Sequence, residues 1–560
     1  MTKPLSSLLL VVALGGALLA QSGANGRHHV SEADLREWLT YLASDRLQGR
    51  ATFSEGLALA SAYIADELRK AGVKPGGDAG TYFQAVPVLG IKTTHRSSLT
   101  VEINGKTRTF KHGEGVRFPA NAGGKRTFTV NRVHFVGYGL NVPAAKIDDY
   151  AGRKVEGDAV VWLGAEGPAA LDAREHRRAL FRRNRYATDT MKAAAAIGPD
   201  VPAPQPPGNQ PAGQGPRGAA DPDVDFTTVQ KLESPVAPAV TVSDAVLEFI
   251  FASAPVPYAD LKARAEKREA LPAATIEARL TFTIDADYTV TRTQYTHNVV
   301  GVVEGSDPQL KNTYVAIGAH HDHVGHATGR VVDGRRQGAP GRVKDGALDD
   351  VVWNGADDDA SGSATMIAVA KAFAQGPRPK RSLVFTWYTG EERGLWGSRY
   401  YVDFPTVPLS GLVAQLNMDM VGRNRDDKAS EANTVYIIGS DRISTELHNI
   451  NDDANHALAS PLVLDYEMND PEDPEQLYTR SDHYSYAAKG IPIVFYTTGL
   501  HPDYHTNEDE VEKINFEKMT RIGQLVYETA WRVANLDHAP VRDNKGPRAG
   551  KGTQGKLTHP

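Results

Sequence analysis

The sequence predicts an α/β protein whose mixed, mostly parallel β-sheet is flanked by helices, together with a separate β-rich unit. Two observations support this fold class. From about residue 294 onward, short apolar β segments alternate with helical stretches, which is the pattern of a parallel α/β sheet. Between about residues 101 and 160, short β segments such as residues 126–138 instead follow one another with turns between them. The change in pattern indicates a second unit of different architecture.

The composition is that of an ordinary globular protein and excludes several other classes. At about 150 residues per domain, the 560 residues suggest three to four structural units. Hydrophobic residues make up 41% of the chain and charged residues 23%, and the mean hydropathy is -0.38. The net charge of -6 gives no electrostatic reason to expect a nucleic-acid partner. Because the chain has no cysteine, any metal ion must be held by His, Asp and Glu.

The first residues have the features of a signal peptide. Lys3 precedes an apolar run over residues 8–20, which is too short to span a bilayer, and small residues near its end offer cleavage sites. A buried core helix is the alternative, but the polar residues 21–23 disfavour it. We therefore expect residues 1–24 to be a signal peptide and the protein to be exported to a bacterial periplasm or exterior. No later segment stays apolar for about 18 residues, so no membrane span is predicted.

Helix signals and biased segments divide the rest of the chain. A capping box at residues 31–34 opens one amphipathic helix, and a second helix begins near Ser54 and ends at Gly72. Residues 198–222 are so rich in proline and glycine that a surface loop is expected there, and residues 538–560 are expected to form a disordered tail. An arginine cluster over residues 174–185 lacks interleaved aromatics, so a solvated helix face is favoured over an anion-binding patch.

Acidic and imidazole side chains follow the ends of the predicted strands of the α/β part. The strands are expected at residues 298–303, 314–318, 382–388, 413–418 and 491–498, with a helix over residues 361–373. In open α/β sheets, ligands bind at the carboxyl ends of the strands. The residues that leave those ends are His320 with Asp322, Asp357 to Asp359, Glu391 with Glu392, Asp419, and His501 with Asp503 and His505. Each alone has a structural explanation, but their joint placement on one edge points to a ligand site.

This set of side chains fits a pair of divalent metal ions. Zinc binds imidazole nitrogen and carboxylate oxygen readily, and two ions about 3.5 to 4 Å apart need one carboxylate that bridges them. The adjacent pair Glu391 and Glu392 supplies one carboxylate for a metal and another for a general base. Asp322, two residues after His320, can accept the second imidazole N–H of that histidine and orient it.

Five motifs together resemble those of peptidase family M28, the co-catalytic zinc exopeptidases. They are GAHHDHVG (318–325), NGADDDASG (354–362), TGEERGLWGS (389–398), LNMDMVG (416–422) and the stretch from RSDHYSY to DEVEKIN (480–515). The resemblance implies a zinc-exopeptidase sandwich formed by residues 28–124 and 257–537. The β-rich unit, with FVGYG (135–139) and DDYAG (148–152), is similar to the protease-associated (PA) domain often inserted in these enzymes, which is expected at residues 125–256.

The resemblance also implies a role for each site residue. His320 and Asp419 would bind one zinc ion, Glu392 and His505 the other, with Asp358 bridging the two, Glu391 as general base and Asp322 as orienting residue. It further implies a cis peptide bond between Asp358 and Asp359.

The implied activity is that of a zinc-dependent aminopeptidase that removes N-terminal residues from peptide substrates. A carboxypeptidase, a dipeptidase or a glutaminyl cyclase on the same scaffold is the alternative, and a non-catalytic receptor-like protein is disfavoured because every ligand is present. Arg393 and Arg480 are the candidates for a cation that would bind a substrate carboxylate.

Several neighbouring residues are expected to stay outside the metal site. Local packing or a place at the rim is expected for His321, His323 and His326, and contact with solvent or the rim for His501. A substrate contact or a structural hydrogen bond is expected for His483. Tyr496 and Tyr504 are candidates to line the pocket. The insertion over residues 329–352 is expected to flank the cleft.

Overall fold

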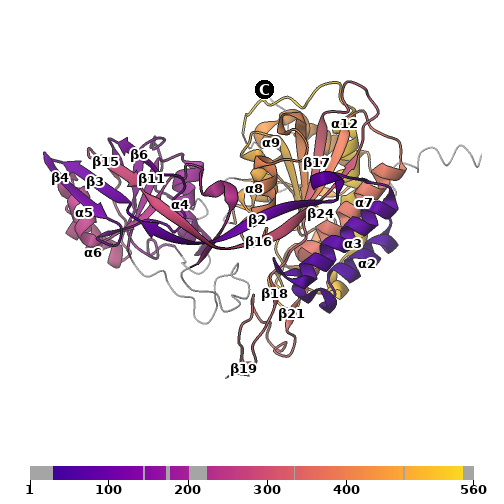
Figure 1. Ribbon diagram of the computed structural model, residues 1–560, viewed down its shortest axis with the longest axis horizontal. Helices are drawn as coiled ribbons and strands as arrows, with labels where there is room; N and C mark the ends of the chain where they lie inside the picture. Colours follow the sequence, from indigo (N-terminus) through magenta and orange to yellow (C-terminus); the bar gives the residue numbers. More distant parts are fainter. Residues whose placement is uncertain are drawn as a thin grey trace, which may run out of the picture.

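The computed structural model describes residues 30–142, 145–171, 177–200, 224–332, 334–470, 473 and 475–546. Figure 1 shows two units, one built on a large sheet with helices on both of its faces and a smaller β-rich one, joined by two long strands. These strands are β2 (Phe83–His95) and β16 (Ala286–Val303), which pair antiparallel along nearly their whole length. The predicted signal peptide at residues 1–24 lies outside the described residues.

The large sheet is mixed and is parallel at its centre. Its order is β12 (Asp225–Thr228), β2, β16, β22 (Ser382–Tyr388), β17 (Tyr314–His320), β23 (Leu412–Met418), β26 (Ile493–Thr497), β24 (Thr434–Ile438) and β25 (Val463–Asp465), with β1 (Lys74–Pro75) beside β16. The four strands β22, β17, β23 and β26 run parallel. The pairings on either side of them, β16 with β22 and β24 with β26, are antiparallel. The predicted α/β class with a mixed sheet is confirmed.

Helices cover both faces of this sheet. One layer contains α2 (Glu32–Leu42), α3 (Glu55–Ala71), α7 (Gly362–Gln375), α10 (Thr445–His456) and α12 (Phe516–Asn535), and it encloses the largest apolar core. On the other face, Tyr401 of α8 (Trp396–Asp403) and Tyr486 of α11 (His483–Ala487) pack with Val384 of the sheet. A short helix, α9 (Ser440–Ile443), precedes α10. The predicted start of α3 is confirmed, because Ser54 caps the helix by accepting from the Leu57 amide, and Gly72 ends it with a positive φ of 84°.

The smaller unit has two sheets and a core of its own. One sheet has the order β14 (Ala274–Ile276), β7 (Val133–Phe135), β10 (Ala159–Val161), β11 (Ala195–Pro199), β13 (Ala239–Val242) and β5 (Val116–Arg117). The other has the order β4 (Lys106–Lys111), β3 (Ser98–Ile103), β15 (Arg279–Ile284) and β6 (Arg126–Val130). The helices of this unit are α4 (Arg177–Arg185), α5 (Asp244–Ile250) and α6 (Tyr258–Glu266).

The boundaries expected for this unit, residues 125 and 256, are too narrow. Its apolar core runs from Leu99 to Ile284. The reason is the pairing of β3 with β15, which joins a segment before the expected start to one after the expected end. Since these two strands lie far apart in sequence, local pattern alone does not assign them to one sheet.

Two smaller expectations also change. Gly198 and Pro199 belong to strand β11, while residues 201–222 of the expected Pro/Gly-rich loop lie outside the described residues. Part of the expected disordered tail is attached, because the Val541 amide donates to Glu446 at 2.8 Å and the Asn544 amide donates to the carbonyl of Ile443 at 3.0 Å. Residues 547–560 lie outside the described part.

The arginine cluster is not uniformly solvated. Arg183 of α4 is buried, stacks at 3.7 Å on the Trp162 ring and donates to the backbone carbonyls of Gly164 and Ala165. Arg182 of the same helix donates to the Thr479 hydroxyl at 2.9 Å, which attaches the smaller unit to the larger one.

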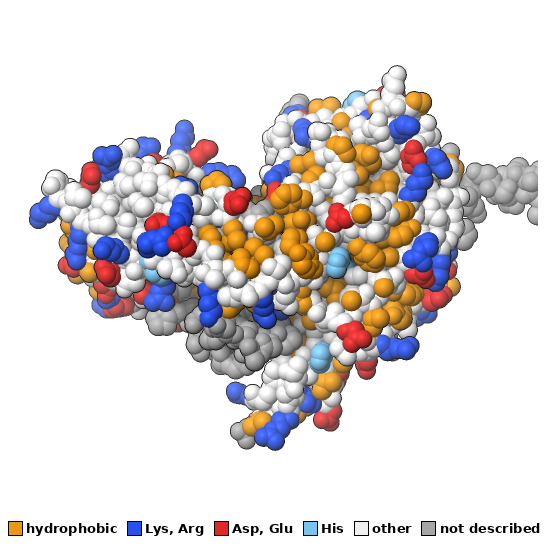
Figure 2. All heavy atoms as spheres, in the orientation of Figure 1, with side chains coloured by type: hydrophobic (Ala, Val, Ile, Leu, Met, Phe, Trp, Pro, Cys, Tyr) orange, Lys and Arg blue, Asp and Glu red, His pale blue; other side chains and the backbone are white. Residues whose placement is uncertain are grey.

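Short strand pairs complete the fold. They are β8 (Asn141–Val142) with β9 (Ile147–Asp148), β18 (Gly325–His326) with β21 (Val352–Trp353), and β19 (Val331–Val332) with β20 (Arg335–Arg336). Figure 2 shows hydrophobic side chains gathered where the two units join. Val290 and Tyr295 of β16 are exposed. Among the described residues, no helix is both long enough and apolar enough to cross a bilayer.

Candidate metal centre

The parallel strands bring the predicted ligands to one edge of the large sheet. His320 is the last residue of β17 and pairs in register with Tyr388, the last residue of β22. Glu391 and Glu392 follow β22 after a two-residue turn, and Asp419 directly follows β23. His505 comes from the loop after β26. Because parallel strands end at the same edge, these side chains converge although they lie far apart in sequence.

The three consecutive aspartates before α7 have three different roles. Asp359 accepts from the backbone amides of His320 and Met420, which ties the ends of two strands to the helix start. Asp357 accepts from the Gly422 amide at 2.6 Å. Asp358 lies between them, and the peptide bond that joins it to Asp359 is cis, as the family resemblance implies. Only Asp358 directs its carboxylate at the other predicted ligands.

Two clusters of candidate ligands share the carboxylate of Asp358. On one side, the His320 Nε2 atom lies 3.2 Å from Asp358 Oδ1 and 3.6 Å from Asp419 Oδ1. On the other side, the His505 Nε2 atom lies 2.9 Å from Asp358 Oδ2 and 3.0 Å from Glu392 Oε1. Each oxygen of Asp358 therefore faces a different cluster, which is the arrangement of a bridging ligand. All five predicted metal ligands, His320, Asp358, Glu392, Asp419 and His505, are brought together.

The clusters fit divalent zinc in donor chemistry and in spacing. Two ligands bound tetrahedrally at about 2.1 Å from a zinc ion lie about 3.4 Å apart, close to the separations observed in both clusters. Asp358 Oδ2 and Glu392 Oε1 are buried and have no hydrogen-bond partner among the described residues. Such acceptors are costly to bury without a partner, so a cation is the expected one.

The charges of the two clusters compensate one another. Burial acts to lower the pKa of His320, but the carboxylates of Asp419 and Asp358 outweigh it and raise that pKa well above its usual value. Burial likewise acts to raise the pKa of Asp358, yet His320 and His505 hold it well below its usual range. The Asp358 carboxylate therefore stays ionised at neutral pH.

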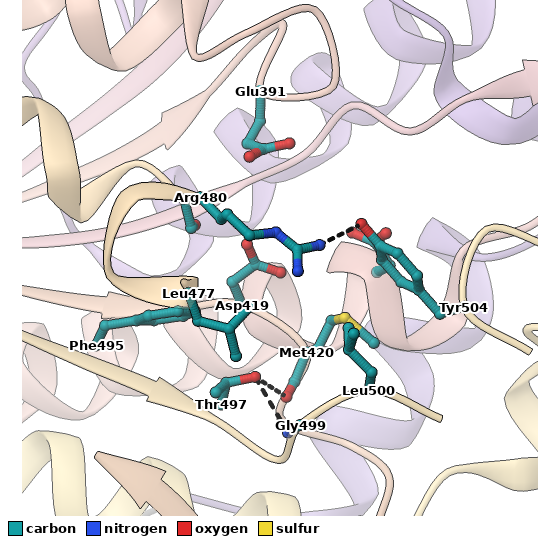
Figure 3. Close-up of a pocket in the computed structure, with 12 residues that line it drawn as sticks. Glu391, Asp419, Met420, Leu477, Arg480, Phe495, Thr497, Gly499, Leu500 and Tyr504 are labelled. Atoms are coloured by element: carbon teal, nitrogen blue, oxygen red, sulfur yellow. Dashed lines mark hydrogen bonds between the residues drawn. The ribbon is translucent and has the colours of Figure 1, made fainter. Parts of the chain in front are cut away.

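A cavity opens beside the clusters. Asp358, Glu391 and Asp419 line it on the ligand side. Figure 3 shows the carboxylates of Glu391 and Asp419 and the guanidinium of Arg480 directed into this space. Four apolar side chains also line it, namely Met420, Leu477, Phe495 and Leu500. The cavity can therefore take an apolar group beside the clusters.

Glu391 differs electrostatically from its neighbour. Burial raises the pKa of Glu391 well above its usual range, with repulsion from Glu392 and Asp419 adding to the effect while His320 opposes it. Burial also acts to raise the pKa of Glu392, but His505 outweighs it and lowers that pKa to about 2. A carboxylate with a raised pKa beside a cavity suits a general base, whereas a fully ionised one suits a ligand.

Asp322 orients His320 through a different atom from the one expected. The His320 Nδ1 atom lies 3.0 Å from the backbone carbonyl of Asp322 and 3.8 Å from its carboxylate, so the carbonyl accepts the N–H. This leaves Nε2 free to face Asp358. The carboxylate of Asp322 instead accepts from the Glu391 amide at 3.1 Å and from the Thr52 hydroxyl at 3.1 Å. It therefore positions the predicted base as well.

His323 was expected to stay outside the site, and the structure contradicts this. The His323 Nδ1 atom lies 3.0 Å from Glu392 Oε1, and the ligand atoms of His323, Asp358, Glu392 and His505 all lie within 4.8 Å of one another. A position three residues beyond the end of β17 carries no sequence signal for this placement. The fold bends the chain after His320 back over the ligands.

His501 is also misplaced by the sequence analysis, which expected it at the rim or in solvent. Its ring is buried, and Nε2 lies 3.4 Å from Asp357 Oδ2 and 3.9 Å from Asp509 Oδ1. Asp509 in turn accepts from the backbone amides of Asp357 and Asp358. His501 and Asp509 thus hold the backbone and side chain of the segment that contains Asp357 and Asp358.

The remaining histidines, His321, His326 and His483, lie outside the two ligand clusters, as expected. His321 Nδ1 donates to the carbonyl of Tyr388 at 2.7 Å, and burial lowers the His321 pKa to about 3. His483 donates to the carbonyl of Tyr478 at 2.8 Å rather than facing the cavity. His326 belongs to neither cluster.

Of the two tyrosines, only Tyr504 lines the cavity, stacked at 4.0 Å on the His505 ring. Tyr496 points into the core and donates to Asn451. Of the two arginines, Arg480 lines the cavity, where it binds Glu475 at 2.6 Å, and Arg393 does not line it.

Two residues of the site were missed by the sequence analysis. Arg50 is buried and donates to the carbonyls of His321, Asn354 and Gly355, so the N-terminal segment joins the first two ligand motifs. Its only signal in the sequence is its place at the end of the short motif LQGR (residues 47–50). Asp482 is buried near the ligands, and burial raises its pKa to about 7.

Comparison with known proteins gives the following findings. The model of "Peptidase family M28" matches residues 298–530. A probable leucine aminopeptidase of Trichophyton verrucosum is 29% identical over 237 residues, which cover 40% of this chain and 56% of the relative. A probable zinc metalloprotease of Pyrenophora tritici-repentis is 25% identical over 223 residues, covering 33% and 45%. The chain thus spans about half the length of the curated relatives it matches. The solved aminopeptidase from Aneurinibacillus sp. strain AM-1 aligns over 93% of this chain and 98% of its own, at 18% identity and a TM-score of 0.44.

Proposed function

Residues 298–530 belong to peptidase family M28, and from that premise we propose that the chain is a zinc-dependent aminopeptidase that removes N-terminal residues from peptides. The observation that carries the proposal is the pair of ligand clusters that share Asp358. Two ions are proposed, one held by His320, Asp358 and Asp419 and the other by Asp358, Glu392 and His505. When bound, such a pair supplies the Lewis acidity that activates water and polarises a peptide carbonyl.

Glu391 is proposed as the general base. Its carboxylate lines the cavity beside Asp358 and Asp419, and it contributes to neither ligand cluster. In its ionised form it would accept a proton from the attacking water and deliver it to the departing amine, a role that contributes about 10² to 10⁴ in rate. The Asp322 carboxylate, bound to the Glu391 amide, would keep the base in place.

The cavity supports a free N-terminus and an apolar first side chain. The carboxylates of Glu391 and Asp419 face the cavity and favour a cationic α-amine. Leu477, Phe495 and Leu500 offer an apolar surface for the side chain of the first residue. We propose substrates with leucine-like or aromatic N-terminal residues.

The alternative is an enzyme that grips a substrate carboxylate. Arg480 lines the cavity and is the observation in favour of a carboxypeptidase or dipeptidase. Its guanidinium already binds Glu475 at 2.6 Å and the Tyr504 hydroxyl at 3.3 Å, which reduces what it offers to a substrate. A glutaminyl cyclase would use the same ligands without cleaving a peptide bond. A receptor-like role is disfavoured by the complete ligand set.

A panel of matched peptides tests the proposal. One leucyl peptide is offered with free ends, with an acetylated N-terminus and with an amidated C-terminus, each with and without chelator. We expect acetylation to abolish most of the kcat/KM, amidation to change it little, and chelation to stop the reaction. Cleavage of the acetylated peptide with refusal of the amidated one would favour the carboxypeptidase, and Arg480→Gln would then be the next variant.

Export and the identity of the smaller unit complete the proposal. The apolar run at residues 8–20 supports a signal peptide and a periplasmic or secreted bacterial protein.

FVGYG and DDYAG in the smaller unit support a PA-type domain. Because Arg182 of α4 binds Thr479 two residues from the cavity residue Leu477, this unit is placed to restrict which substrates enter.

A further inference from the structure

We propose that His323 is a fourth protein ligand of the ion held by Asp358, Glu392 and His505, an inference that rests on the proposed metal site. Its Nδ1 atom lies 3.0 Å from Glu392 Oε1 and 3.8 Å from Asp358 Oδ2. These separations bracket the value of about 3.4 Å for two ligands on one tetrahedral zinc ion. The ligand set implied by the family resemblance omits this histidine.

The His323 ring is held in place by its surroundings. The His323 amide donates to the carbonyl of Arg50 at 3.1 Å, beside the bridge between Ala51 and His323. The ring packs directly over Gly355, where a Cβ atom would come within 2.6 Å of two ring carbons. It also meets the His505 ring edge-on, at 5.6 Å between centroids. The position of Nδ1 is therefore fixed before any ion binds.

The ring nitrogens of His323 form no hydrogen bond with any residue that the structure describes. The residue is 1% exposed, and both nitrogens lack a hydrogen-bond partner among the described residues. The His323 Nδ1 and Glu392 Oε1 atoms are close together, but they lack the geometry of a hydrogen bond. This arrangement is expected when the lone pairs of both atoms point at the same metal ion. Burying an imidazole without a hydrogen-bond partner costs desolvation free energy. A cation placed between Nδ1, Glu392 and His505 would offset this cost.

The proposal makes the two metal sites unequal. One has four protein ligands, His323, Asp358, Glu392 and His505, and the other has three, His320, Asp358 and Asp419. A zinc site with four protein ligands is closed, while a site with three keeps a position for water or substrate. We expect the four-ligand site to fill first and to bind more tightly.

Stepwise metal binding to the full chain tests the proposal. The protein is stripped with chelator and titrated with Co²⁺, whose binding is followed by visible absorption and by the shifted imidazole N–H resonances in proton NMR. The wild type should bind two ions in two steps, with two such resonances from the first. His323→Ala should weaken the affinity of the first binding step by more than about 100-fold, which exceeds the effect of removing a residue that only hydrogen-bonds to a metal ligand. The same variant should lose one of the two imidazole N–H resonances.

Two further variants make the test specific. His321→Ala removes the neighbouring buried imidazole, which bonds to the Tyr388 carbonyl, and should leave both binding steps and both resonances unchanged. His323→Asp places a carboxylate oxygen close to the position of Nδ1 and should recover at least tenfold of the lost affinity. Circular dichroism establishes that each variant is folded, and His323→Asn replaces the alanine variant if that one unfolds.

The outcomes separate this inference from the proposed function. Two binding steps in His323→Ala with the affinity and resonances of the wild type would overturn the inference and leave the two-metal site intact. A wild type that binds no Co²⁺ or Zn²⁺ would overturn both. If the wild type binds two ions but cleaves no peptide, the proposed function fails while the ligand assignment stands on the binding data.

Discussion

At the scale of single residues, Glu391 and Glu392 show how the fold gives adjacent side chains of one type different chemistry. Glu392 faces His505, and its pKa falls to about 2, so it stays ionised. Glu391 faces the cavity, and burial raises its pKa well above the usual range. The first is suited to hold a cation, and the second to accept a proton once it has ionised.

Glu391→Gln should separate these two roles. The substitution keeps the size of the side chain but removes the base, so kcat should fall by about 10² to 10⁴ while both metal ions stay bound. Metal content by mass spectrometry of the dialysed protein and steady-state rates on the leucyl peptide measure the two effects. Asp358→Ala should lose metal as well, and Glu512→Gln, an exposed acid, should change neither. A near-normal kcat in Glu391→Gln, or the loss of its metals, would refute the assignment.

At the scale of elements, the loop after β26 carries His505 and is attached by buried charges. Asp503 is buried and binds Lys344 at 2.6 Å, Lys513 at 3.0 Å and Arg423 at 3.0 Å. Lys344 belongs to the insertion over residues 329–352, and the Arg342 amide donates to the His505 carbonyl at 2.9 Å. The insertion thus packs against the ligand loop, which is consistent with its expected place beside the cleft.

Asp503→Asn should destabilise the protein in a pH-dependent way. Burial acts to raise the pKa of Asp503, but hydrogen bonds from Lys344, Lys513 and Arg423 outweigh it and lower that pKa. A lowered pKa stabilises the fold above the unfolded value of about 3.9 and loses this effect as the pH falls. We expect a loss of about 1 to 3 kcal/mol in the free energy of unfolding at pH 7.

Urea unfolding of wild type and variant at pH 7 and pH 3 measures this effect. Chelator is present in both, so that metal release does not add a pH dependence of its own. The difference between the two proteins should shrink by about 1 kcal/mol at pH 3, because the wild type loses its advantage there. The control is Asp349→Asn, which changes an exposed acid of the same insertion. Its free energy of unfolding should match that of the wild type at both pH values. A pH-independent difference would show that the charge of Asp503 is not responsible.

At the scale of the whole molecule, the metal centre joins parts of the chain that are distant in sequence. Its ligands follow β17, β22, β23 and β26, and Arg50 of the N-terminal segment holds the first two ligand motifs from outside. Bound ions would therefore link the strand ends in the folded state and not in the unfolded one. Metal binding should then be coupled to the stability of the entire larger unit.

Removal of metal should lower the melting temperature along with the activity. An ion at 100 times its Kd contributes about 2.7 kcal/mol, which for a unit of this size corresponds to a fall in Tm of about 4 °C. Calorimetry and peptidase assays before and after chelation measure both. Zn²⁺ should restore them, and Mg²⁺ should not, because it prefers oxygen ligands. An unchanged Tm and full activity at near-zero metal content would rule out the metal centre.

The alternating pattern after residue 294 by itself determined the α/β class and the strand ends from which the ligands come. A strand end can be read from the local hydrophobic pattern, and parallel strands place their carboxyl ends together, so the acidic and imidazole side chains at this edge could be identified without coordinates. The choice of five ligands among them came from the resemblance of their motifs to peptidase family M28. Tertiary structure alone decided that His323 meets Glu392, that Asp322 uses its carbonyl toward His320, and that β3 pairs with β15. These three contacts depend on how the chain bends after a strand and on which distant segments meet. Neither of these properties produces a hydrophobic periodicity that can be read from the sequence.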